Sequence, residues 1–400
     1  MCGIVGYIGH RNAYDVIIKG LKRLEYRGYD SAGITLLNGS MNIYKKAGKV
    51  SDLENFAEGK DINGKVGMGH TRWATHGEPN DRNAHPHKSN NGKLSIIHNG
   101  IIENYATIKT ELTKRGHVFH SDTDTEVLIH LIEEIQHKAN VSLEEAVRLS
   151  LHEVIGAYAI VIISEDQQDE LIVARKGSPM VIGIGDGEHF IASDATPIIE
   201  YTKNVVYLND SEMAIVKKDS LVIKNIENIV QNPVIHELEM QLEMIEKNGY
   251  EHFMMKEIYE QPKSIYDSMR GRIRANEGLI SLGGLKEYET KFKNADRIII
   301  VACGTSWHAG LVAEYIIEEF ARVPVEVEYA SEFRYRNPII YPTDIVIAIS
   351  QSGETADTLA ALRHAQSLGM KHTLTICNVA TSAMVRECKL AYVTRAGAEI

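Results

Sequence analysis

The pattern of apolar residues changes part-way along the 400-residue chain, and this change constrains the fold more than any other feature. Up to about residue 235, short apolar runs are separated by Gly, Asn and Asp, with helical periodicity between only some of them. From Asp296 onward, apolar strands and helices alternate regularly. Runs of strands with a few helices indicate a layered α+β domain, whereas regular alternation indicates a doubly wound parallel sheet.

We therefore predict two domains, because a chain of this length exceeds one ordinary core. Residues 2–235 form the first domain, and residues 286–400 form the second. Residues 236–285 are polar and helical in pattern, which predicts a helical linker. The sequence stops shortly after a predicted strand without a closing helix, so we expect the second domain to be incomplete.

The charge balance excludes several classes of partner. Asp and Glu number 54 and Lys and Arg 43, which gives a diffuse net charge of −11. Nucleic acids and anionic membranes need a basic face, so we expect neither as a partner. We also expect no signal peptide or membrane span. The 4 cysteines are too scattered for a disulfide scaffold, which predicts a reducing cytoplasm.

Cys2 is the first candidate for chemistry. Removal of Met1 would free its α-amine, whose ordinary pKa of about 7.7–8.0 leaves a useful uncharged fraction near neutrality. Amine and thiol on one residue form a minimal pair of base and nucleophile. For an isolated cysteine at this position, an incidental or buried thiol is the better interpretation. The surrounding motifs decide between the two.

Five blocks of sequence follow one another in a characteristic order and spacing. They resemble the N-terminal-nucleophile glutamine amidotransferases over roughly residues 2–235. The resemblance implies a four-layer αββα sandwich with Cys2 as the nucleophile that takes ammonia from glutamine. The blocks are residues 2–6, 27–33, 69–77, 98–105 and 121–126.

The same resemblance assigns the residues that act with Cys2. The Asn99 carboxamide and the Gly100 N–H would stabilise the oxyanion formed at the glutamine amide, although an Asn-Gly turn is the ordinary alternative. Arg72 suits the α-carboxylate because its guanidinium binds with two parallel hydrogen bonds. Asp124 suits the α-ammonium group of glutamine.

Other residues of these blocks receive supporting roles. Thr75, His76 and Gly77 resemble the loop that closes on glutamine, although a structural histidine explains His76 almost as well. Arg27 resembles a residue that supports the N-terminal segment. Trp73 resembles an aromatic gate for ammonia, with a core or lid tryptophan as the alternative.

A His-Pro-His sequence invites a metal interpretation that we do not favour. His85 and His87 flank Pro86 without further ligands at suitable spacing. We predict a surface loop at this position, and neither a metal nor a cofactor for the chain.

Two turns rich in Ser and Thr follow predicted strands in the second half and open helices. Helix N-termini at the carboxyl ends of parallel strands bind anions, although ordinary capping also explains them. No Walker or dinucleotide motif is present. Both turns resemble those of sugar-isomerase (SIS) domains, which bind phosphosugars. That resemblance assigns the phosphosugar to Thr305, Ser306, Ser350, Gln351, Ser352 and Thr355.

The two halves together resemble the isomerising glutamine–fructose-6-phosphate aminotransferases. The resemblance implies glutamine and fructose 6-phosphate as substrates, glucosamine 6-phosphate and glutamate as products of this first step of hexosamine synthesis, and a homodimer at full length. Members of that family carry two sugar-isomerase domains, so we expect this chain to hydrolyse glutamine and to make little glucosamine 6-phosphate. The alternative is a phosphosugar-binding regulator with an inert glutaminase-like half.

Overall fold

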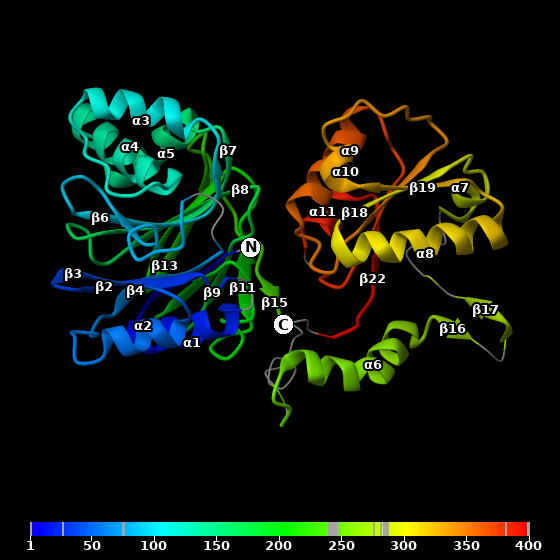
Figure 1. The fold of residues 1–400 in the computed structure, drawn as a ribbon, viewed down its shortest axis with the longest axis horizontal. Helices are drawn as coiled ribbons and strands as arrows, with labels where there is room; N and C mark the ends of the chain where they lie inside the picture. The colour runs from blue at the N-terminus through cyan, green and yellow to red at the C-terminus, as the bar shows by residue number, and fades with distance from the viewer. Residues whose placement is uncertain are drawn as a thin grey trace. The chain divides into compact units, whose positions relative to one another are not determined.

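The computed structural model describes most of the chain, and its residues fall into two compact units, residues 1–242 and 243–400 (Figure 1). No helix in the described part of the chain is long and apolar enough to cross a membrane. The described residues are 2–25, 28–73, 77–238, 247, 249–274, 277–280, 282, 288–380 and 382–397.

Two antiparallel sheets form the middle of the first unit. In spatial order, the first sheet contains β15 (His236–Glu237), β11 (Asn204–Tyr207), β9 (Val181–Ile184), β10 (His189–Ala192), β1 (Gly3–Ile8), β4 (Val66–Arg72), β2 (Ser31–Asn38) and β3 (Ser40–Ala47). The second contains, again in spatial order, β14 (Val230–Gln231), β13 (Ser220–Asn225), β12 (Glu212–Lys217), β8 (Leu171–Lys176), β7 (Gly156–Ser164), β6 (Leu94–Ile102) and β5 (His87–Lys88).

Helices cover the outer face of each sheet (Figure 1). The sheets share an apolar core that includes Ile4, Met68 and Ile97, and a second core lies between β6 and its covering helices. The predicted αββα sandwich is therefore confirmed. The first sheet carries α1 (Ala13–Leu24) and α2 (Val50–Ala57), and the second carries α3 (Tyr105–Lys114), α4 (Asp124–Ala139) and α5 (Leu143–Glu153).

Strand β4 shows how the sequence divides its two faces. A Cβ at Gly69 would lie 2.4 Å from Ile17 of α1, so glycine lets this helix pack directly on the strand. The alternate residues Met68, His70 and Arg72 face the other way, because side chains alternate along a strand. Their side is that of the core between the two sheets, to which Met68 belongs. The alternation thereby places two polar side chains at the sandwich interior.

The second unit contains a parallel sheet with helices on both faces, as the alternating pattern predicted. Even-numbered Ile298 and Ile300 of β18 pack on the α8 side, and odd-numbered Ile299 and Val301 pack on the α10 side. In spatial order the strands are β19 (Val325–Tyr329), β18 (Ile298–Ala302), β20 (Ile345–Ile349), β21 (Thr373–Cys377) and β22 (Leu390–Val393). The helices are α7 (Glu289–Lys293), α8 (Gly304–Ala321), α9 (Ala330–Phe333), α10 (Ala356–Ser367) and α11 (Ala383–Glu387).

One further helix precedes this sheet within the second unit, α6 (Phe253–Met269), followed by a two-stranded hairpin of β16 (Ile273–Arg274) and β17 (Leu279–Ile280). The end of α6 is tied to the last strand, since Tyr392 donates to the Ser268 carbonyl at 3.4 Å. Arg272 lies over the Tyr392 ring at 4.2 Å and donates to the Val393 carbonyl.

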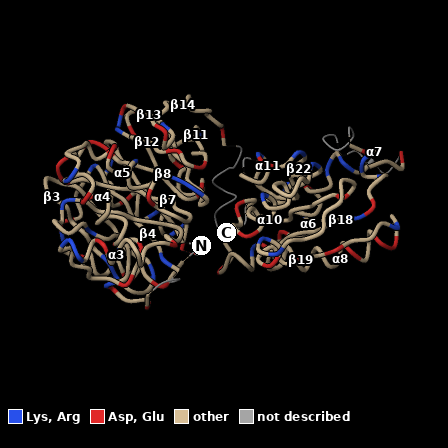
Figure 2. Tube along the Cα trace, turned by 90° about the horizontal axis from the view of Figure 1, so that it is seen from above, with Lys and Arg blue, Asp and Glu red and all other residues tan. Residues whose placement is uncertain are grey.

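Acidic and basic residues are interspersed along the described trace of both units (Figure 2). This mixed distribution agrees with the diffuse negative charge of the sequence.

Candidate active site

Cys2 lies directly before β1, and its thiol contacts the chain just after β4. The Trp73 N–H donates to Cys2 Sγ at 3.2 Å, and Sγ lies 3.5 Å from the Trp73 carbonyl oxygen. Strands β1 and β4 pair antiparallel with Gly3 opposite Thr71, which brings these two chain segments together. An N–H directed at sulfur stabilises a thiolate over a thiol, because it donates to the charged form.

The second sheet contributes Asn99 and Gly100 from β6. Asn99 is 8% exposed, and its Nδ2 donates to the Cys2 carbonyl oxygen at 3.0 Å. Gly100 has a φ of +137°, and a Cβ there would lie 2.1 Å from the Ala157 carbonyl oxygen. Glycine is therefore required at this position of β6. The pair supplies N–H donors of the kind that stabilise an oxyanion.

Arg72 and Asp124 supply one buried charge of each sign. Arg72 is 4% exposed and donates to the carbonyl oxygens of Gly77 at 3.2 Å and Glu78 at 3.4 Å. Burial lowers its pKa, opposed by nearby negative charge, including that of Asp124. Asp124 is 6% exposed in the first turn of α4, where the helix dipole favours a carboxylate. Its Oδ2 accepts from the Ile102 N–H at 2.7 Å.

Of the remaining residues predicted for the first unit, the structure describes Trp73 and Gly77. Trp73 is 46% exposed and packs edge-on against Tyr29 with ring centroids 5.4 Å apart, so it is not a core tryptophan. Gly77 has a φ of +78°, which favours glycine. Thr75, His76 and Arg27 lie outside the described residues.

A cluster of buried histidines lies beside the site and was missed by the sequence reasoning. The prediction of a surface loop is wrong, because His85 and His87 are only 6% and 4% exposed. His85 stacks on His70 with ring centroids 4.3 Å apart, and His87 Nε2 lies 3.1 Å from Thr123 Oγ1. Burial lowers the pKa of His70 to about 3 and that of His85 well below its ordinary value, so these rings are neutral.

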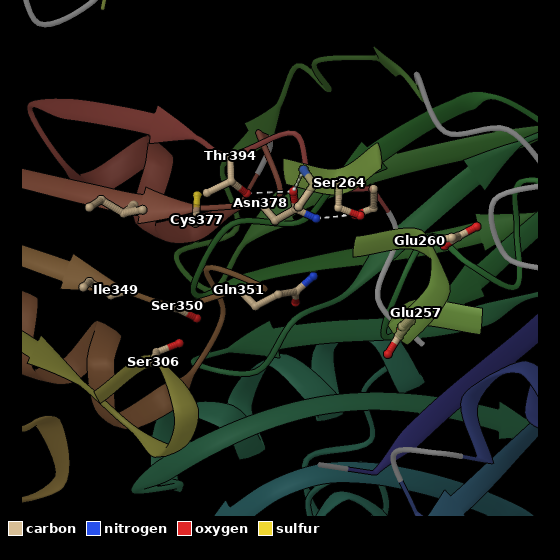
Figure 3. Close-up of a pocket in the computed structure, with 13 residues that line it drawn as sticks. Glu257, Glu260, Ser264, Ser306, Ile349, Ser350, Gln351, Cys377, Asn378 and Thr394 are labelled. Carbon is tan, nitrogen blue, oxygen red and sulfur yellow. Dashed lines mark hydrogen bonds between the residues drawn. The ribbon is translucent and has the colours of Figure 1, made fainter. Parts of the chain in front are cut away.

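A second candidate site is a pocket of about 320 Å³ in the second unit (Figure 3). It opens at the carboxyl ends of β18 and β20, where the strand order of the sheet reverses and open α/β sheets bind ligands. Of the predicted residues, Ser306, Ser350 and Gln351 line it. Ser306 lies in the first turn of α8, and Ser350 follows β20 directly.

The other predicted phosphosugar residues do not line the pocket, and two of them form hydrogen bonds within the loop that follows β20. Thr355 Oγ1 lies 2.8 Å from Ser350 Oγ, which also accepts from the Gly353 N–H at 3.1 Å. Ser352 Oγ accepts from the Glu354 N–H at 3.2 Å. Thr305 is not among the lining residues either.

Several lining residues were not predicted from the sequence. Glu257, Glu260 and Ser264 come from α6, which the sequence pattern presented as a linker. Asn378 and Thr394 follow the last two strands, and Thr394 Oγ1 donates to Asn378 Oδ1 at 2.9 Å. Their position after parallel strands is the signal that could have found these two residues. No local motif marks the α6 residues.

Comparison with known proteins identifies both units. Residues 49–241 match the model of the glutamine amidotransferase domain, and residues 291–400 match that of the SIS domain. The whole chain is 58% identical to a glutamine–fructose-6-phosphate aminotransferase (isomerising) of Chlorobaculum tepidum, and 56% identical to one of Bacteroides thetaiotaomicron. The chain belongs to the glutamine–fructose-6-phosphate aminotransferase family. It spans 66% of the length of each of these two relatives.

A solved structure of lower identity supports the fold of this family member. The glutamine phosphoribosylpyrophosphate amidotransferase of B. subtilis matches with a TM-score of 0.51, at 20% identity. The match covers 94% of this chain and 81% of that one. At this identity the likeness shows a shared fold and nothing of the substrates.

The neutral histidines of this aminotransferase-family chain predict that acid destabilises its first unit. Their pKa values are lowered by burial, so the unfolded chain binds more protons below the ordinary value of about 6.5. The free energy of unfolding therefore falls as pH falls, by up to about 1.4 kcal/mol per pH unit for each histidine that stays neutral when folded.

The His130→Phe variant tests this linkage. His130 stacks on Phe119 with centroids 4.6 Å apart, and burial lowers its pKa to about 4. Because the variant lacks this titrating ring, its free energy of unfolding should fall between about pH 6 and about pH 5 by about 1 kcal/mol less than that of the wild-type chain. The free energy of unfolding at each pH is measured by denaturant unfolding in a Trp307→Phe background, in which the fluorescence comes from Trp73. An unchanged pH dependence of the free energy of unfolding in His130→Phe would contradict the account.

Proposed function

We propose that this chain supplies the glutaminase site and the phosphosugar-binding site of the reaction for which its family is named, the transfer of a nitrogenous group. Cys2 releases ammonia from glutamine, and the ammonia is added to fructose 6-phosphate to give glucosamine 6-phosphate and glutamate. The observation that carries the proposal is the hydrogen bond from Asn99, the neighbour of Gly100 in β6, to Cys2 in a chain at least 56% identical to two named relatives over its full length. The comparisons do not favour an inert regulatory protein.

The first half-reaction follows from the chemistry of an N-terminal cysteine. After loss of Met1, the α-amine of Cys2 takes the proton from Sγ, and the thiolate attacks the side-chain carbonyl carbon of glutamine. The tetrahedral intermediate collapses with cleavage of the C–N bond, and the departing nitrogen leaves as ammonia after taking up a proton. Water then hydrolyses the thioester, which gives glutamate and restores the thiol.

The charge that develops during the reaction, together with the charges of glutamine itself, indicates which other residues contribute to glutamine hydrolysis. Negative charge forms on the former carbonyl oxygen, where the Asn99 Nδ2 and the Gly100 N–H would donate to it. Arg72 and Asp124 carry the two charges needed to bind the α-carboxylate and α-ammonium group of glutamine. Their burial supports this role, because a buried charge acts across a low dielectric and is weakly screened. Thr75, His76 and Gly77 complete this binding site, and Arg27 supports it.

The second unit would hold the phosphosugar in its pocket. Hydroxyl and amide groups of Ser306, Ser350 and Gln351 line the end of the pocket at the α8 N-terminus, where free N–H groups attract a phosphate. Thr305, Ser352 and Thr355 belong to the same two turns and complete the phosphate-binding set that we propose. The exposed Trp73 is proposed as the ammonia gate.

The proposal also covers the oligomeric state of the protein and its cellular compartment. We include a homodimer, which the family resemblance implies for the full-length protein. We also include a cytoplasmic location, because the four cysteines are free thiols, as in a reducing compartment.

A glutaminase assay with a cysteine variant tests the first half-reaction. The purified chain should release glutamate and ammonia in equal amounts from glutamine, and Cys2→Ala should abolish both products because the nucleophile is lost. Cys303→Ala is the matched control, since it removes a thiol of the second unit. Undiminished glutamate release by Cys2→Ala would reject the proposed role of Cys2.

Calorimetric titration with fructose 6-phosphate tests the second site. Ser306→Ala should weaken binding by about 10- to 100-fold, because it removes a hydroxyl that would donate to a charged phosphate. Ser268→Ala is the control, since that hydroxyl donates to the Ser264 carbonyl within α6 at 2.8 Å. Unphosphorylated fructose should bind far more weakly than fructose 6-phosphate. Equal affinities of the two variants for fructose 6-phosphate would argue against this pocket.

A further inference from the structure

The Asn99 carboxamide is held at both of its ends. Its Nδ2 donates to the Cys2 carbonyl oxygen at 3.0 Å, and its Oδ1 lies 2.8 Å from His70 Nε2. The three residues form a chain of hydrogen bonds from the interior of the sandwich to the N-terminal cysteine. The proposed glutaminase chemistry leaves His70 without a role.

The hydrogen bond fixes the tautomer of His70. The Asn99 Oδ1 can only accept, so the proton of the neutral ring must sit on Nε2. The other ring nitrogen, Nδ1, is buried and makes no hydrogen bond of regular geometry among the described residues, although a backbone contact with His98 partly opposes the lowering of the His70 pKa by burial. An unprotonated Nδ1 fits these surroundings better than a buried N–H without an acceptor.

The two hydrogen bonds also fix which way the carboxamide faces. If the Asn99 carboxamide turned by half a rotation, its oxygen would face the Cys2 carbonyl oxygen and its NH₂ group would face the His70 N–H. Both hydrogen bonds would be lost, and like atoms would be opposed at each end. The observed orientation alone points the NH₂ group toward the residue that carries the thiol.

His70 is itself held in place by its surroundings. It lies in β4 between two strands, opposite Ile4 of β1 and Gly33 of β2, and it is 1% exposed. Its ring stacks on His85 at an interplanar angle of 25°. A donor supported in this way does not have to reorganise when charge develops beside Cys2.

We propose that His70 is a positioning residue for the oxyanion-stabilising amide, its Nε2–H holding the Asn99 carboxamide with the NH₂ group turned toward the reacting carbonyl. His70 touches neither glutamine nor the thiol, and it acts through Asn99. The inference rests on the proposed glutaminase function, since it assigns a part of that same site.

Steady-state glutaminase kinetics of His70 variants test the proposal. His70→Leu removes the donor and should lower kcat by about 10- to 100-fold, less than the loss of the oxyanion donor itself, with little change in KM. His70→Gln carries an amide N–H that reaches a similar position, and it should recover most of the lost kcat. Reduced activity in His70→Leu without recovery in His70→Gln would overturn the positioning role.

A double-mutant cycle separates this role from a general structural one. Because His70 acts through Asn99, adding His70→Leu to Asn99→Ala should cause almost no further loss of kcat. A further loss equal to that of His70→Leu alone would overturn the proposal. If Asn99→Ala itself keeps the wild-type kcat, or if the wild-type chain does not hydrolyse glutamine, the proposed function fails instead.

A measurement on the unaltered chain does not depend on how the variants fold. The ¹⁵N NMR shifts of the His70 ring, assigned by comparison with His70→Gln, should show a protonated Nε2 and an unprotonated Nδ1 near neutral pH. The opposite tautomer, with an unprotonated Nε2, cannot donate to Asn99 Oδ1 and would overturn the proposal.

Discussion

The hydrogen bond from the Asn99 carboxamide to the Cys2 carbonyl oxygen is the interaction on which the first site depends. Cys2 enters the first sheet at β1, whereas Asn99 belongs to β6 of the second sheet. These two residues meet because the sheets stack over one apolar core, with β1 and β4 on one side and β6 and β7 on the other. Sheet packing therefore sets the position of the nucleophile relative to the donors, and no single loop does so.

Burial has different consequences for the charged and the neutral groups around this bond. Arg72 and Asp124 remain available as charges, held by backbone carbonyl groups and by a helix N-terminus. The nearby histidines respond to the same burial by losing their protons, and they act as a neutral array of donors and acceptors. The site thereby combines two fixed charges with a rigid, uncharged support behind Asn99.

Much of this arrangement could be predicted from residues and spacing. The regular alternation of strands and helices from Asp296 onward indicated the doubly wound sheet directly. The structure accordingly buries both faces of its strands, with Ile298 on one face and Ile299 on the other. The sequence blocks identified the amidotransferase half, and the position of Asn99 beside Cys2 agrees with them. The histidines at 85 and 87 were misread, because a His-Pro-His segment looks like an exposed turn and only tertiary packing stacks His85 on His70. The α6 wall of the pocket was missed for a related reason, since its contact with the sheet is set by long-range packing.

The central claim is that Cys2 becomes an N-terminal nucleophile for glutamine. Intact-mass and peptide mass spectrometry after incubation with a diazoketone analogue of glutamine test it most directly. The account predicts a chain that lacks Met1 and carries one adduct, on the peptide that begins at Cys2. An adduct on another cysteine, or no adduct on a chain correctly processed to Cys2, would contradict it.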